Sequence, residues 1–343
     1  MTRSRAKNDN PDGNTALYYR QRASAGLIVT EGAPITPEGR GQVYTPGMYS
    51  PEQIAAWRMV TAAVHEEGGA IFAQLWHVGR ASHVSLQPGG IAPVSSVATR
   101  APKAETYGFD ASGNAAPFPQ SQPRALETAE VKRVTGDFVQ AARNALEAGF
   151  DGVELHGANG YLFEQFINGG LNTREDEYGG RAIANRLRFT LETVDAVSQA
   201  IGASCTGIRL APFGRFNDMP AFDGEAETWL TLAKELSHRK LAYVHISDQE
   251  TLGAQAIPPG FLARFRHEYQ GTLIVAGGYD KARGQAALDA GRADLIAIGR
   301  PFIANPDLVE RLNNDWPLAE PNRATFYSGD ADGYIDYPAY AGD

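Results

Sequence analysis

Residues 128–158 read TAEVKRVTGDFVQAARNALEAGFDGVELHGA, a helical pattern followed at once by a strand. Apolar residues recur at helical spacing in the first part, with Thr128 as the candidate N-terminal cap and Gly149 as the stop. The apolar run at 152–158 is typical of a strand that is covered on both faces. A helix that ends on glycine directly before such a strand indicates a parallel α/β sheet.

The same alternation runs along the whole chain of 343 residues. It predicts a single (β/α)8 TIM-barrel domain over residues 1–343, because regular βα units of this total length suit that fold. Strands are predicted at 26–32, 70–77, 152–158, 206–212, 242–248, 272–278 and 294–300. Helices are predicted at 50–68, 128–149, 182–202, 225–239, 280–291 and 305–312. The barrel's first strand is missing from this pattern, since MTRSRAKNDNPDGN opens the chain.

One connection interrupts the regular alternation of strands and helices, after what would be the third barrel strand. Residues 78–127 form a proline-rich and glycine-rich excursion that also holds Tyr107, Phe109 and Phe118. Long connections in compact barrels commonly serve as lids or binding walls. The aromatic residues favour an ordered piece with a hairpin around 111–113, and a disordered insert is the alternative.

Composition narrows the class of protein. Lys and Arg number 31 against 40 Asp and Glu, which gives a net charge of −9 and argues against nucleic acid or an anionic membrane as partner. The single cysteine excludes an internal disulfide and an iron–sulfur cluster. Neither a signal peptide nor a membrane-spanning run is apparent, so a cytoplasmic location is expected.

The active site of a parallel barrel lies where the strands end, so the residues there indicate the chemistry. All lysines fall elsewhere, at 7, 103, 132, 234, 240 and 281, which makes a Schiff-base enzyme improbable. Glu154 and His156 share one face of a strand, but no further ligand pair completes a metal site, so no metal is predicted. Glu154 is expected to pair with a neighbour inside the barrel.

The last two strands end in glycine-rich turns, AGGYDKARG (276–284) and IGRPFIANPDL (298–308). Loops at this place in a barrel commonly bind phosphate through backbone N–H groups, and Arg300 would add a charged hydrogen bond. Two ordinary glycine turns are the alternative. Together with Gln74, Arg209 and the polar cluster at 156–161, a phosphate site suits a ring cofactor with polar edges, such as FMN.

Several motifs in order along the chain resemble the old yellow enzyme family of FMN-dependent ene-reductases. Within that family, the chain looks similar to the bacterial N-ethylmaleimide, glycerol trinitrate and morphinone reductases and to the plant oxophytodienoate reductases. The motifs are YYRQRASAGLIVTEGAPITPEGRG (18–41), FAQLWHVGRASH (72–83), HGANGYLFEQFINGGLNTREDEYGGR (156–181), NRLRFTLETVDAV (185–197) and TFYSGDADGYIDYP (325–338).

The resemblance implies a role for each matching residue. FMN would be bound by Thr2, Gly32, Gln74, Arg209, Gly278, Gly299 and Arg300. The substrate would be bound by Trp76, His156, Asn159, Tyr161, Phe326 and Tyr327. His156 and Asn159 would hold the substrate oxygen and Tyr161 would deliver a proton, which makes these three the catalytic residues.

The function implied is reduction of activated C=C bonds in α,β-unsaturated carbonyl, maleimide or nitro compounds by ping-pong hydride transfer. NADPH, or NADH, would be the reductant, and a small activated alkene the partner. The missing first strand is expected to leave two exposed sheet edges, which a neighbouring segment or a second subunit in a homo-oligomer would fill. The alternatives are a truncated flavin- or ligand-binding barrel without turnover and a non-redox barrel enzyme.

Overall fold

Seven parallel strands form one curled sheet in the computed structural model, which describes residues 2–249, 257–327 and 329–342. The order along the sheet follows the chain, β1-β2-β7-β8-β9-β10-β11. The strands are β1 (Ile28–Pro34), β2 (Ile71–Trp76), β7 (Gly152–Gly157), β8 (Thr206–Leu210), β9 (Tyr243–Ser247), β10 (Leu273–Ala276) and β11 (Leu295–Ala297). Each overlaps a predicted strand, so the parallel barrel architecture is confirmed.

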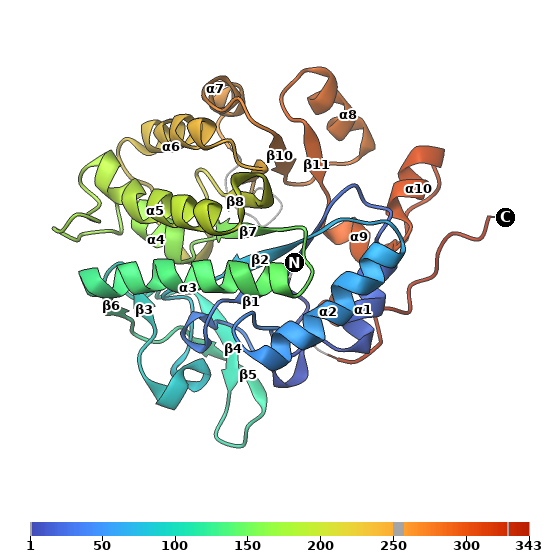
Figure 1. The fold of residues 1–343 in the computed structure, drawn as a ribbon, viewed down its shortest axis with the longest axis horizontal. Coiled ribbons are helices and arrows are strands. Elements are labelled where there is room, and N and C mark those ends of the chain that lie inside the picture. Colours follow the sequence, from blue (N-terminus) through green and yellow to red (C-terminus); the bar gives the residue numbers. More distant parts are fainter. Residues whose placement is uncertain (1, 250–256, 328, 343) are drawn as a thin grey trace.

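Helices surround the strands (Figure 1). Six were predicted: α2 (Pro51–Glu66), α3 (Thr128–Glu147), α5 (Ile183–Ile201), α6 (Glu225–Arg239), α8 (Lys281–Asp289) and α10 (Leu308–Asn314). Four were not: α1 (Gly13–Arg20), α4 (Leu162–Ile167), α7 (Phe261–Glu268) and α9 (Arg300–Ala304). The outer core lies between sheet and helices, where the rings of Phe138, Phe163 and Phe189 from α3, α4 and α5 pack with centroids 4.8 and 4.9 Å apart.

Local sequence signals explain where these helices begin and end. The Ser50 hydroxyl accepts the backbone N–H of Gln53 at the start of α2, as a cap residue should. The prediction of Thr128 as the cap of α3 is wrong: the helix already begins at Thr128, whose hydroxyl donates to Asp176 instead. Gly149 stops α3 as predicted, with a φ of 90° that favours glycine.

The two edges of the sheet differ. Within the described residues no pairing joins β11 back to β1. Strand β11 is partly exposed, with Leu295 46% accessible. Strand β1 is buried at every residue except Val29. Residues from the start of the chain contact it: the backbone N–H of Glu31 donates to the Tyr19 hydroxyl, and the Glu31 carboxylate accepts from the backbone N–H of Arg3. The expectation of two exposed edges is therefore wrong for β1.

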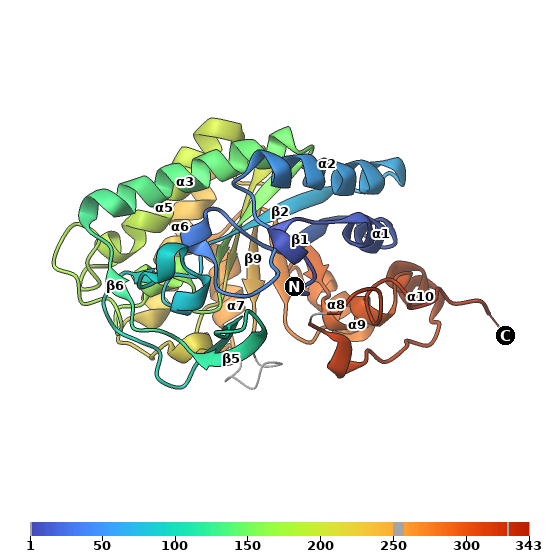
Figure 2. The same ribbon diagram turned by 90° about the horizontal axis from the view of Figure 1, so that it is seen from below.

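The excursion after β2 is ordered. Strands β4 (Glu105–Phe109) and β5 (Ala115–Pro119) pair as an antiparallel hairpin, which confirms the predicted turn. The shorter strands β3 (Val94–Ser95) and β6 (Arg124–Ala125) pair in parallel at its base. Figures 1 and 2 show the hairpin projecting from the body of the protein. Its last residue is followed by the buried Gln120, whose amide donates to the Asn217 side chain at 2.8 Å.

Across the described ranges of the chain, no helix is both long and apolar enough to cross a membrane.

Candidate active site

Polar side chains fill the inside of the curled sheet above an apolar layer. Phe72, Tyr243 and Ile274 form a small apolar cluster of their own, apart from the main core. Side chains two residues further along a strand face the same side. This alternation places Gln74 and then Trp76 of β2 on the inner side of the sheet. It does the same for Glu154 and then His156 of β7, and for His245 and then Ser247 of β9. The interior therefore changes from apolar to polar toward the carboxyl ends of the strands.

Glu154 is the centre of a buried polar network. Its carboxylate accepts the Gln74 side-chain amide at 2.7 Å and contacts Nδ1 of His245 at 2.9 Å. Burial opposes ionisation of Glu154, but His245, Arg209 and Gln74 outweigh it and lower its pKa to about 2. Burial lowers the pKa of His245, so we assign a neutral ring that donates Nδ1–H to the carboxylate. The prediction that Glu154 pairs with a neighbour is confirmed.

Arg209 lies beside this network and keeps one donor without a partner among the described residues. It stands in register between His156 on β7 and His245 on β9. One terminal nitrogen donates to the Ser247 hydroxyl at 2.9 Å, whereas Nε is buried without a partner among the described residues. Burial lowers the pKa of Arg209 and Glu154 raises it, but a guanidinium stays charged at neutral pH. The protein thus holds a fixed cation inside the barrel.

Three predicted residues meet as an aromatic group. The Tyr161 ring packs edge-on against Trp76 and His156, with centroids 5.1 and 5.0 Å away, and Trp76 stacks on His156 at 6.3 Å. Gly32 lies against the same group, because a Cβ there would approach the Trp76 ring to 2.8 Å. The predicted residues of β1, β2 and the segment after β7 are therefore brought together.

His156 and Tyr161 differ in protonation chemistry. Burial and the charge of Arg209 lower the pKa of His156 to about 3, so its ring is neutral near pH 7. Its buried Nδ1 has no partner within the described residues, which leaves the ring able to bind a ligand. Burial raises the pKa of Tyr161 well above its ordinary value, and nearby Tyr327 adds to the rise. Tyr161 therefore keeps its proton at any physiological pH.

The turn at residues 158–161, which we call the cluster loop, has an unusual backbone. Asn159 and Gly160 have φ values of 61° and 71°, in the left-handed region that favours asparagine and glycine. A Cβ at Gly160 would meet the carbonyl oxygen of Phe216. The buried Glu164 on α4 accepts the Gly160 backbone N–H at 2.8 Å. These contacts hold Asn159 and Tyr161 in place.

Replacing Glu164 with glutamine is expected to stabilise the protein increasingly as pH rises. Burial raises the pKa of Glu164 from 4.5 to about 8, with Glu225 adding to the rise. Between these values the carboxyl ionises in the unfolded chain but not in the folded one, so the wild type loses stability as pH rises from 4.5 to 8. Glutamine keeps an acceptor for Gly160 and has no proton to lose.

The measurement is urea unfolding of both proteins at pH 5, 6.5 and 8. The stability difference between Glu164→Gln and wild type should grow across the series. The same substitution at exposed Glu175 is the control and should produce no such trend. A difference independent of pH would contradict the raised pKa.

The remaining predicted residues lie around this centre. Gly278 and Gly299 follow β10 and β11 and are exposed, and Arg300, which begins α9, is partly buried. Thr2 precedes Arg3, whose backbone N–H donates to Glu31 on β1. Phe326 is buried and its carbonyl accepts from the Arg3 guanidinium, whereas Tyr327 is 55% exposed. No metal-binding group of three or more His, Cys, Asp or Glu occurs in the part of the chain that the structure describes.

FMN fits these residues. A flavin needs hydrogen-bonding groups at its pyrimidine edge, and Arg209 presents a buried Nε without a partner in the described structure. The Gln74 side-chain amide donates one hydrogen to Glu154, which leaves its carbonyl oxygen for the flavin. A phosphate needs backbone free of side chains, and a Cβ at Gly299 would meet nothing within 4 Å.

Two residues at the cluster loop were not predicted from the sequence. Gln249, just after β9, is buried and donates its amide to Asn159 Oδ1 at 3.0 Å. Asn217, in the segment after β8, donates its amide to the Asn159 carbonyl at 2.9 Å. The only sequence signal for them was their place after strand ends, which they share with many other residues.

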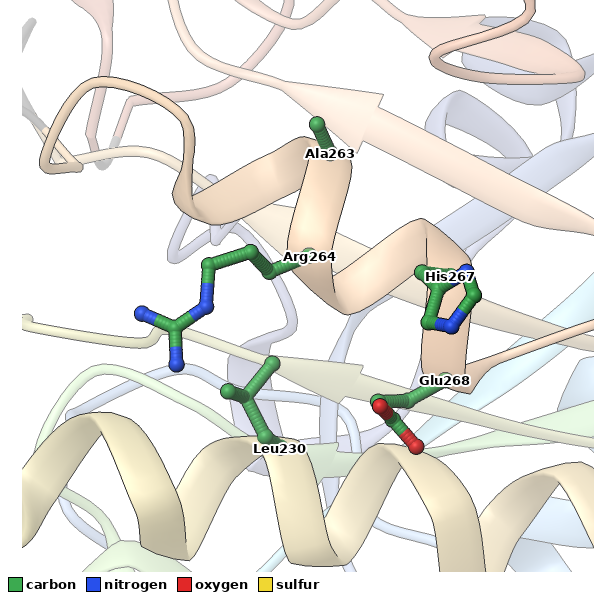
Figure 3. Close-up of a pocket in the computed structure, with 5 residues that line it drawn as sticks. All are labelled: Leu230, Ala263, Arg264, His267 and Glu268. Atoms are coloured by element: carbon green, nitrogen blue, oxygen red, sulfur yellow. The ribbon is translucent and has the colours of Figure 1, made fainter.

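A separate pocket lies between helices α6 and α7 (Figure 3). It is lined by Leu230 of α6 and by Ala263, Arg264, His267 and Glu268 of α7. No predicted site residue lines it.

Comparison with known proteins yields consistent likenesses. Residues 1–319 match the profile of the NADH:flavin oxidoreductase / NADH oxidase family. The 12-oxophytodienoate reductase 1 of Oryza sativa subsp. japonica is 43% identical over 343 residues, which cover 98% of this chain and 87% of the relative. The structure of morphinone reductase superposes with a TM-score of 0.97 at 46% identity, covering 99% of this chain and 91% of the other.

Two further structures bear on the site. An old yellow enzyme homologue from Zymomonas mobilis superposes with a TM-score of 0.93 at 38% identity, covering 99% of this chain and 94% of the other. Morphinone reductase has also been solved in complex with tetrahydroNAD, and that structure is 47% identical with a TM-score of 0.95, covering 99% of this chain and 92% of the other.

Proposed function

This chain belongs to the NADH:flavin oxidoreductase / NADH oxidase family, and from this premise we propose which reaction its site performs. As a member related to old yellow enzyme, it is an FMN-dependent NAD(P)H oxidoreductase of the ene-reductase type. We propose that it reduces activated C=C bonds of α,β-unsaturated carbonyl, maleimide or nitro compounds in a ping-pong cycle. Tyr161 is the proposed proton donor.

The cofactor residues divide by the part of FMN that they would hold. Gln74 and Arg209 would bind the pyrimidine edge, where the fixed cation favours the negative charge of a reduced ring. Gly278, Gly299 and Arg300 would bind the phosphate, Gly32 would face the ring, and Thr2 would contact its edge. Bound FMN supplies hydride transfer, from NAD(P)H to the β carbon of the alkene. Every other step falls to the side chains of this chain.

His156 and Asn159 would bind the substrate oxygen. Negative charge develops on that oxygen as the β carbon is reduced, and donors placed beforehand stabilise such charge. A neutral His156 can donate a hydrogen bond without carrying a charge of its own, which its pKa of about 3 supports. The amide of Asn159 is a second donor. Trp76, Phe326 and Tyr327 would form the walls around the substrate.

Tyr161 would complete the reaction by protonating the α carbon. A phenol that stays protonated is suited to this role, and burial raises the pKa of Tyr161 well above its ordinary value. The packing of Tyr161 against both His156 and Trp76 supports a shared pocket for oxygen and carbon. This juxtaposition of a neutral histidine and a protonated tyrosine beside a partly buried Arg209 is the observation that carries the proposal.

Steady-state kinetics with purified, FMN-loaded protein tests the proposal. We expect NADPH or NADH to be oxidised without oxygen only when 2-cyclohexenone or N-ethylmaleimide is present, with formation of the saturated product. Double-reciprocal plots at several alkene concentrations should be parallel, as one shared site requires. Intersecting lines would reject the ping-pong order. FMN retention without alkene reduction would instead indicate a flavin-binding barrel that does not turn over.

A further inference from the structure

Gln249 is buried in a position that fixes its amide orientation. Its side-chain oxygen accepts two backbone N–H groups, from Arg215 at 2.9 Å and from Phe216 at 3.2 Å. Both donors are backbone groups, which have no alternative orientation, so the other end of the Gln249 amide must be the NH2 group. A reversed amide would place NH2 against two N–H donors and leave three donors unsatisfied in the protein interior.

The segment that supplies these two N–H groups is itself fixed. The Arg215 guanidinium makes two hydrogen bonds of 2.8 Å to the carboxylate of Glu225 at the start of α6. A paired arrangement of this kind is geometrically specific. The next residues also contact the cluster loop, because Asn217 donates to the Asn159 carbonyl. The amide of Gln249 is therefore set by a rigid neighbour.

The orientation of Gln249 determines that of Asn159. The Gln249 NH2 donates to the Asn159 side chain at 3.0 Å, so the atom that receives it must be the amide oxygen. The remaining end of the Asn159 side chain is then an NH2 group, a donor. Backbone geometry adds to the constraint, since Asn159 has a φ of 61° and its carbonyl is bound by Asn217.

We propose that Gln249 is a positioning residue that makes Asn159 present a hydrogen-bond donor to the substrate oxygen. This inference rests on the proposed function, in which Asn159 binds that oxygen. Without Gln249 the Asn159 amide could turn by half a rotation and present its own oxygen to an anionic group. The backbone N–H groups of Arg215 and Phe216 fix the orientation of the Gln249 amide, and Gln249 in turn fixes that of Asn159. This chain of hydrogen bonds determines that Asn159 presents a donor, and not an acceptor, to the ligand.

Gln249→Glu is the sharpest test, because glutamate has the same shape. One carboxylate oxygen still accepts the N–H groups of Arg215 and Phe216. The other now needs a donor from Asn159, which turns its amide and places its oxygen toward the ligand. We expect the Kd of 4-chlorophenol to rise about 10- to 100-fold, the effect of replacing a donor with an unpaired acceptor. Titration of the visible absorption of the FMN-loaded protein measures this Kd.

A double-mutant cycle separates orientation from the added charge. In an Asn159→Ala background, Gln249→Glu should change the Kd by less than about twofold, since the side chain through which it acts is gone. An equal loss in both backgrounds would show a direct charge effect and overturn the proposal. Asn159→Asp, which leaves Gln249 untouched and places an oxygen toward the ligand, should weaken phenol binding to a similar degree. Wild-type affinity in Asn159→Asp would also overturn it.

The controls distinguish failure of this proposal from failure of the proposed function. If Asn159→Ala alone leaves phenol affinity unchanged, Asn159 does not bind the oxygen. That result rejects both the proposed role of Asn159 and the positioning role of Gln249. If Asn159→Ala weakens binding and the cycle is additive, only the role of Gln249 is rejected. FMN retention on gel filtration and the midpoint of urea unfolding show whether each variant is folded.

Discussion

Replacing Tyr161 with phenylalanine is expected to slow alkene reduction by about 10²- to 10⁴-fold, the usual contribution of a positioned general acid. Phenylalanine keeps the ring packed against Trp76 and His156 and removes only the hydroxyl. Reduction of the flavin by NAD(P)H requires no proton from Tyr161, so its rate should stay near that of the wild type.

Stopped-flow measurement of the two half-reactions in the absence of oxygen tests this expectation. Flavin reduction is followed with NADPH alone, and reoxidation with 2-cyclohexenone after the reductant is exhausted. Tyr340→Phe, in the C-terminal segment beside Trp316, is a matched control and should alter neither rate. An equal slowing of both half-reactions in Tyr161→Phe would reject the proton-donor role.

Replacing Glu154 with alanine is expected to lower the free energy of unfolding by roughly 2–6 kcal/mol, about 1–3 kcal/mol for each of two buried polar groups that lose their partner. The change leaves the Gln74 amide and the His245 ring buried without their acceptor. FMN affinity should fall as well, because the Gln74 side chain is no longer held. Urea unfolding of the flavin-free protein and FMN titration measure the two effects separately.

Glu154→Gln gives a matched variant of nearly equal volume, and its pH dependence tests the ionised state. Glu154 has a pKa of about 2 in the folded protein against 4.5 ordinarily. Its stabilising contribution is therefore complete above pH 4.5 and is lost as pH falls toward 2. Glu154→Gln should be less stable than wild type at pH 6, and the difference should shrink toward pH 2. A constant difference would indicate a carboxyl that is already protonated at pH 6.

The order of strands and helices was predictable because each βα unit contains local sequence patterns that mark its own strand and helix. Gly149 ends a helix and an apolar strand follows at once, and the same order recurs along the chain. Helix α4 escaped prediction for a physical reason: all of its residues from Leu162 to Ile167 are buried, so no polar face produces a helical period. Helix α1 is short, and its signal is the cap formed between Asp12 and Thr15.

The grouping of the candidate site residues was predictable where they are neighbours in sequence. His156, Asn159 and Tyr161 lie between positions 156 and 161, so their nearness needs no knowledge of the fold. Gln249 and Asn217 reach the same turn from the ends of other strands, and only the closing of the sheet places them there. The polarity of Asn159 is likewise a property of contacts across three segments, which no local pattern encodes.

The left-handed backbone of Asn159 limits how this enzyme can be engineered. A library that randomises position 159 tests backbone strain together with the proposed substrate contact, because most L-residues are disfavoured at a φ of 61°. Asparagine, aspartate, histidine and glycine tolerate that conformation best, so variants with altered substrate range are expected chiefly among these four. Screening effort for new substrates is better spent at Tyr327, whose side chain is exposed and whose backbone carries no such restriction.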